Sequence, residues 1–140
     1  MIRRPNPNKL VTGPSDVVDF GGALAGATIG IGAEVGNGRA IAIQLKDGQG
    51  RNLAVRAAVQ IAVLADANGD AFVATGGSTG IAIGSEGALL PIVAKKLFLA
   101  LSEADGRVEL TWTDTGSEPA YLAVLLPSGK LAVSSALTNT

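Results

Sequence analysis

A chain of 140 residues is the size of a single domain, and a hydrophobic content of 47% excludes a disordered polymer. The 11 basic and 12 acidic residues give a formal net charge of −1, without the basic excess of nucleic-acid-binding domains. Cysteine and histidine are both absent, which excludes disulfides and removes the usual zinc ligands. Apolar stretches end well short of the ~18 residues of a membrane span. We therefore expect neither nucleic acid nor a membrane as a partner.

Residues 1–22 differ from the rest of the chain and predict an extended N-terminal arm. Prolines at positions 5, 7 and 14 remove backbone donors and bias the preceding residues toward extended geometry. The basic side chains can pair with acidic groups on a neighbouring chain, and a solvated tail is the alternative. No apolar run follows the first basic residues, so no secretory signal is expected. The arm residues expected to bind a partner are Arg3, Arg4, Pro5, Pro7, Lys9 and Leu10.

The remainder of the chain, residues 23–140, consists of short apolar segments separated by glycine-bearing turns. Large aliphatic residues occupy every second position of residues 39–46, and apolar residues alternate with Glu and Thr in residues 108–113. Asn68-Gly69 is a strong hairpin signal. Turns that recur roughly every 8–12 residues favour a β-sandwich or barrel. The expected strands are 28–32, 39–46, 55–65, 71–75, 80–83, 95–101, 108–113, 119–126 and 130–137. Residues 95–101 are the better strand of a longer stretch, 89–101, in which Pro91 indicates an edge or a strand start.

Two of these segments are apolar on both faces, namely residues 59–64, apart from Gln60, and residues 121–126. Continuous apolar runs imply burial on both sides of a sheet. A small sandwich has little of its own protein to cover the second face, so we expect a partner subunit there and a homo-oligomer. Trp112 falls on the apolar face of its strand and is expected in the core. Lys95-Lys96 is expected in an exposed strand position.

No motif in the sequence predicts catalytic or cofactor chemistry. Residues 66–70 resemble half a calcium loop, but Ala71 and Gly77 stand where an EF-hand needs glycine and glutamate. Residues 76–80 are glycine-rich, yet they lack the lysine of a phosphate-binding loop and are interpreted as a flexible loop. A serine nucleophile would have no histidine base, and the acidic residues fall almost entirely in turns. We therefore expect no enzyme, no cofactor and no metal.

Two segments resemble bacterial immunoglobulin-like domains. In residues 42–54 a strand ends in an Asp-Gly turn and a small residue restarts the chain. In residues 102–116 an acidic-glycine turn leads into an alternating strand with threonines. The resemblance implies an all-β, immunoglobulin-like β-sandwich over residues 23–140, with residues 1–22 as its extended N-terminal arm.

More broadly, residues 40–135 resemble a group of small phage virion proteins. The shared pattern comprises Leu45-Lys46-Asp47, residues 81–84, Ala104-Asp105-Gly106 and residues 121–131. The resemblance implies a capsid decoration or cement protein that binds the major capsid protein and stabilises the head shell. Such a protein is made in the host cytoplasm and resides on the virion surface. The alternative is a receptor- or carbohydrate-binding module of a tail fibre or cell surface, for which exposed aromatic side chains are expected.

Overall fold

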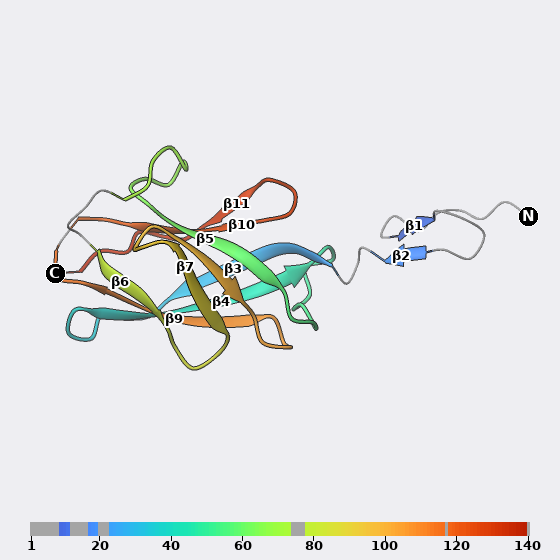
Figure 1. Ribbon diagram of the computed structural model, residues 1–140, viewed down its shortest axis with the longest axis horizontal. Coiled ribbons are helices and arrows are strands. Elements are labelled where there is room, and N and C mark those ends of the chain that lie inside the picture. Colours follow the sequence, from blue (N-terminus) through green and yellow to red (C-terminus); the bar gives the residue numbers. More distant parts are fainter. Residues whose placement is uncertain (1–8, 12–16, 20–22, 74–77, 117, 140) are drawn as a thin grey trace, which may run out of the picture.

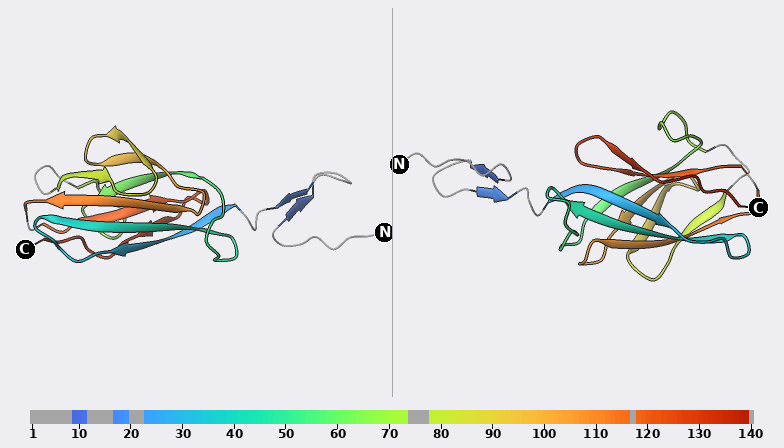
Figure 2. Two further views of the ribbon diagram at one scale, coloured as in Figure 1. Left: turned by 90° about the horizontal axis from the view of Figure 1, so that it is seen from below. Right: turned by 180° about the vertical axis from the view of Figure 1, so that it is seen from behind.

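Two antiparallel β-sheets, one of five strands and one of four, pack face to face around a hydrophobic core (Figure 1). The computed structural model describes residues 9–11, 17–19, 23–73, 78–116 and 118–139. The regular secondary structure of these residues consists of β-strands. The predicted all-β fold class, with two packed sheets, is thereby confirmed. Figure 2 shows the two layers from two further directions.

The four-stranded sheet has the order β3-β4-β9-β6 and the five-stranded sheet has the order β11-β10-β5-β8-β7. The layers approach each other at both edges, where β11 contacts β3 and β6 contacts β7. Strands β1 and β2 pair only with each other, as a separate two-stranded sheet. The bounds are β1 Lys9–Val11, β2 Val17–Asp19, β3 Leu24–Ile31, β4 Gly38–Asp47, β5 Ala58–Leu64, β6 Ser78–Ile83, β7 Ala88–Val93, β8 Leu97–Leu101, β9 Arg107–Asp114, β10 Tyr121–Leu125 and β11 Leu131–Val133.

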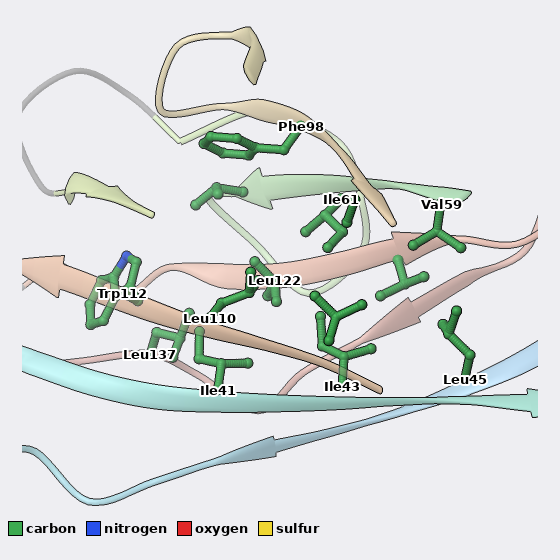
Figure 3. Close-up of a cluster of buried hydrophobic side chains, with 14 of the residues drawn as sticks. Ile41, Ile43, Leu45, Val59, Ile61, Phe98, Leu110, Trp112, Leu122 and Leu137 are labelled. Carbon is green, nitrogen blue, oxygen red and sulfur yellow. The ribbon is translucent and has the colours of Figure 1, made fainter. Parts of the chain in front are cut away.

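Strands β4 and β9 form the centre of the four-stranded sheet, and their alternating pattern decides which face is buried. Ile41 lies opposite Leu110 and Ile43 lies opposite Val108, and all four side chains are buried. Trp112 continues the same face and is fully buried, as predicted. Figure 3 shows the labelled side chains of these strands pointing into the space between the sheets. There they meet side chains from β5, β8 and β10.

The inner face of the five-stranded sheet comes from alternate residues of its three central strands. Val59, Ile61 and Val63 of β5 are buried, as their spacing predicts, together with Phe98 of β8 and Leu122 of β10. Burial of each such side chain contributes about 1.5–3 kcal/mol to folding. Because successive side chains of a strand point to opposite faces, the residues between them must face away from the core.

The turn between β7 and β8 overturns one prediction. Lys95 and Lys96 lie in this turn and not in a strand: Lys95 has a φ of 67°, and the backbone N–H of Lys96 donates to the carbonyl of Val93 over 3.0 Å. The left-handed conformation at Lys95 reverses the chain, so β8 begins only at Leu97. Pro91 lies in β7, an edge strand, where a missing backbone donor is tolerated, as predicted.

Other strand predictions were also wrong in part, and the strand expected at 130–137 is only Leu131–Val133. Within the described residues, the strand expected at 71–75 is an isolated bridge between Phe72 and Leu64, because Asp66 caps a tight turn that returns the chain only briefly to β5. Residues 78–80, expected in a loop, begin β6. Gly80 has a φ of 144° where the pairing with β9 shifts, a conformation that glycine tolerates. This strand start shows no apolar alternation, so the pattern missed it.

Candidate interaction surface

The predicted arm site falls mostly outside the described residues. Arg3, Arg4, Pro5 and Pro7 all lie in residues 1–8, for which no structure is described. The other two predicted arm residues, Lys9 and Leu10, belong to β1, which pairs antiparallel with β2. An isolated pair of strands is marginal in water, so such a pair is stable when it packs on something else. The role of the arm in binding a partner stays a prediction.

The side of the five-stranded sheet that points away from the core is almost entirely apolar, and we call it the outer face. Strand register assigns its members, of which only Gln60 and Tyr121 carry a polar group and none is charged. The outer face consists of Ala58, Gln60, Ala62, Leu64, Ala88, Leu90, Val93, Leu97, Leu99, Leu101, Tyr121, Ala123, Leu125, Leu131 and Val133. Leu64 and Ala123 are buried, and the other members are exposed or half-buried.

One row of paired residues crosses all five strands of the outer face. Leu131 lies opposite Leu125, Leu125 opposite Gln60, Gln60 opposite Leu99, and Leu99 opposite Leu90. The four leucines are 40%, 42%, 37% and 61% exposed, in that order. Gln60 is also exposed and occupies the middle strand. The row therefore places one amide at the centre of a solvent-exposed strip of leucines.

The outer face is as large as the apolar patches that often serve a function on protein surfaces. Strands lie about 4.8 Å apart and advance about 3.3 Å per residue, so five strands of about five residues cover roughly 400 Å² in projection. The largest apolar patch on a typical monomer measures about 300–600 Å² and is often functional. Here the exposed part of the patch reaches across all five strands, while Ala123 within it is buried, so it is a candidate binding surface in its own right.

A shallow hollow lies at the end of the sandwich, where the outer face meets β3. This open hollow of about 420 Å³ is lined by Leu24, Ala58, Val59, Gln60, Leu125, Leu126, Pro127 and Gly129. The lining carries no charge, and the Gln60 amide supplies its polar side-chain group. A hollow of this kind can receive an apolar side chain from another protein surface.

Sequence patterns located this surface in part. The two-sided apolar runs of residues 59–64 and 121–126 predict a second apolar face, and they supply the middle of the outer face. The contribution of β7 and β8 was missed, although Ala88–Val93 and Leu97–Leu101 are equally continuous apolar runs. The same criterion would have found them. Pro91 instead indicated an edge strand, and the two lysines of the turn indicated an exposed strand.

The solvent-facing side of the four-stranded sheet differs from the outer face in its residues. Small residues, including Gly30, Ala40, Ala42 and Thr111, line a shallow hollow of about 440 Å³. This surface lacks the large apolar side chains of the opposite sheet. Glu109 borders the hollow and points outward, as predicted.

The carboxylates beside this hollow are held in an ion-pair network. Arg107 donates from Nη2 to Oε1 of Glu109 over 2.9 Å, and its Nε lies 3.2 Å from Oε2 of Glu86. The hydroxyl of Ser85 donates to the second oxygen of Glu109. One guanidinium therefore binds both carboxylates. In a glycosidase the two carboxyl groups flank the substrate and exchange protons with it, whereas these two are engaged with Arg107.

The aromatic residues bear on the carbohydrate-binding alternative. Of those that the structure describes, Trp112 and Phe98 are buried, Tyr121 is half-buried and Phe72 is 48% exposed. A sugar-binding site stacks its ligand on exposed rings, and the chain's single tryptophan lies in the core. No observation on this chain favours that alternative over a protein-binding role.

Asp47 is the described group with a shifted pKa. Burial opposes its ionisation, but the backbone N–H groups of Gln49 and Arg51 donate to Oδ1 over 2.9 and 3.0 Å, and Arg51 Nε donates to Oδ2 over 3.0 Å. Together with the nearby guanidinium charge, these bonds hold the pKa of Asp47 below its usual value. The carboxylate closes the turn after β4, which is a structural task.

The described residues contain no group of three or more acidic, histidine or cysteine side chains placed to hold a metal ion. No helix with the length and hydropathy of a membrane span occurs in that part of the chain. Comparisons with protein-family models, with curated proteins and with solved structures gave no match to this chain.

Proposed function

We propose that this chain is a structural protein of a bacteriophage virion, a non-enzymatic decoration or cement protein that binds the head shell and stabilises it. The observation that carries the proposal is the outer face, which is apolar across all five strands and has no charged member. Apolar surface of this extent is costly to leave in water and is typical of proteins that work in an assembly. The protein acts by contact, as a homo-oligomer on the virion surface.

The strand order supports an immunoglobulin-like identity for the sandwich. Immunoglobulin domains have one sheet of strands A, B, E and D and a second sheet of strands G, F and C. With β3, β4, β9 and β6 as A, B, E and D, strands β11, β10 and β5 take the places of G, F and C. The β7–β8 hairpin is an addition to this plan, and β8 pairs with β5. The hairpin widens the sheet and thereby enlarges the outer face.

Attachment to the shell is assigned to the arm, residues 1–22. Arg3, Arg4 and Lys9 supply positive charge toward acidic groups of the major capsid protein. Each oligomer carries several arms, and a shell repeats the same binding site many times. Linked weak contacts on a repeating lattice gain affinity by avidity, about 10²- to 10⁴-fold. An oligomer bound to adjacent capsid subunits also resists their separation, which is the cementing action.

Deletion of residues 1–22 tests the proposal. We expect the full chain to co-sediment with undecorated head shells of the phage that encodes it. The deletion should lower the apparent affinity by about tenfold or more, because avidity through the arms is lost. The melting midpoint of the deleted chain should match that of the full chain, because the deleted strands β1 and β2 pair with each other in a sheet separate from the sandwich.

A charge variant separates the arm's cations from its length. Replacing Arg3, Arg4 and Lys9 by alanine should weaken shell binding, whereas Lys95→Ala with Lys96→Ala, in the β7–β8 turn, serves as the control for lost charge elsewhere. A full chain that never co-sediments with shells would reject the decoration function. Binding that the deletion leaves unchanged would reject the role of the arm.

A further inference from the structure

We propose that the outer face is the interface of a two-fold symmetric homodimer, in which two copies stack their five-stranded sheets face to face with Gln60 at the centre. The inference rests on the proposed function in one respect, since an oligomer is the form that is proposed to bind the shell. It goes further by naming the surface that the copies share and the residue on the symmetry axis.

The chemistry of the outer face selects its occupant. None of its members is charged, so a charged partner surface would lose its hydration without gaining an ion pair. The partner must itself be flat, apolar and as wide as a five-stranded sheet. A second outer face meets all three conditions, because in a two-fold interface the same surface patch is used by both subunits.

The charged residues near this sheet stand at its ends. Lys95 is exposed in the β7–β8 turn and Lys130 is exposed in the β10–β11 turn. Arg56 and Glu103, 3.1 Å apart, form an exposed ion pair just before β5 and just after β8. An apolar centre with a polar rim is the usual anatomy of a protein–protein interface.

The area is sufficient for a dimer. Each outer face projects roughly 400 Å², and relief from its leucine side chains adds to the accessible surface. Two such faces therefore bury on the order of 1,000 Å² in total, which reaches the lower limit of specific interfaces and is typical of a reversible dimer. Sheets that pack face to face lie about 10 Å apart, close enough for the leucine rows of two copies to interdigitate.

Gln60 argues for symmetry rather than for an unrelated apolar partner. A purely apolar partner would leave its amide desolvated and without a hydrogen bond, at a cost of about 1–3 kcal/mol. Across a two-fold axis, the amide N–H of one Gln60 can donate to the amide oxygen of the other, and the reverse bond forms at the same time. The central position of β5 in the sheet brings this residue close to such an axis. The pair would also set the register, since only one alignment joins the two amides.

Sedimentation equilibrium and light scattering on the full chain test the dimer, with two variants of exposed residues that leave the core intact. Gln60→Glu should raise the dimer dissociation constant about tenfold or more at neutral pH, because two carboxylates then face each other. Lowering the pH toward the glutamate pKa of about 4.3 should restore the dimer, since a protonated carboxyl is again both donor and acceptor. Leu99→Lys should weaken the dimer at either pH.

Thr28 provides the matched control, because it is exposed on β3 in the opposite sheet. Thr28→Glu adds the same charge and should leave the dissociation constant unchanged. As the chain has no cysteine, Gln60→Cys introduces a single thiol that a short bismaleimide should cross-link between two copies. The Thr28→Cys chain should cross-link far less. Circular dichroism of every variant checks that the monomer remains folded.

Three results would overturn the proposal. The first is a wild-type chain that stays monomeric at every concentration, as expected if the arm or an unrelated protein covers the outer face. The second is a dimer that both Gln60→Glu and Leu99→Lys leave intact. The third is equal cross-linking of the two thiol variants. A dimer disrupted as described, from a chain that binds no head shell, would reject the decoration function and leave this inference standing.

Discussion

Asp47 illustrates how single polar residues serve the fold of this protein. Its carboxylate is nearly buried and receives hydrogen bonds from two backbone N–H groups and from Arg51. These donors stabilise the ionised form, which is why the pKa lies below the ordinary value of 3.8. A group whose pKa is lowered on folding stabilises the native state at pH values above its unfolded pKa. That stabilisation is lost as the pH falls through the folded pKa.

Asp47→Asn should therefore lower stability at neutral pH and flatten the acid side of the pH–stability profile. The asparagine keeps one acceptor oxygen but has no charge to lose below pH 3.8. Urea unfolding between pH 2 and pH 7 measures the effect. If the wild type and the variant lost stability in parallel below pH 3.8, the carboxylate would not be the group responsible.

At the scale of elements, the C-terminal segment after β11 closes the sandwich. Asn139 is buried and donates from Nδ2 to the carbonyls of Asn37, over 2.7 Å, and Asp114, over 3.0 Å. Its Oδ1 accepts from Arg39 Nε over 3.0 Å, and Arg39 Nη2 donates to the carbonyl of Thr138 over 2.7 Å. One asparagine thus ties the end of the chain to the ends of β4 and β9.

Asn139→Ala should destabilise the protein by about 1–3 kcal/mol, because two carbonyls and one guanidinium lose a buried partner. Chemical denaturation gives the free energy of unfolding. Thr138→Ala is the matched control, since Thr138 enters the network through its backbone carbonyl. If Asn139→Ala lowered the free energy of unfolding less than Thr138→Ala, the Asn139 side chain would not hold the C-terminal segment in place.

At the scale of the whole molecule, one core joins the two sheets. Trp112 of β9 and Leu122 of β10 are fully buried in the same cluster, and they come from different layers (Figure 3). Neither sheet can lose its partner without exposing this cluster. The exposed leucines of the outer face lie outside this cluster, so they are free to serve association.

Unfolding should accordingly be a single cooperative transition. Trp112 is the only tryptophan, so its fluorescence reports on the core alone, while far-UV circular dichroism reports on all strands. We expect both signals to give the same midpoint in urea at a fixed protein concentration. A core signal that persisted after much of the strand signal had gone would mean that part of a sheet, such as the β7–β8 hairpin, unfolds separately.

The sequence by itself determined the fold class, most strands and the buried face of each central strand. Alternation assigns Ile41, Ile43 and Trp112 to the buried face of their strands, whichever strands lie beside them, because successive side chains of a strand point to opposite faces. Glycine turns are equally local, since they depend on the backbone freedom of one or two residues. The lysine turn before β8 escaped prediction because a left-handed lysine leaves no local signal.

Only the tertiary structure decided which strands share a sheet. The pairings that align Leu131, Leu125, Gln60, Leu99 and Leu90 join three separate parts of the chain, namely the β10–β11 hairpin, β5 and the β7–β8 hairpin. Sheet order arises from long-range packing of the two layers, and no local pattern encodes it. The apolar runs of residues 59–64 and 121–126 predicted a second apolar face. The fold turned those runs into one continuous surface and put its single amide in the middle.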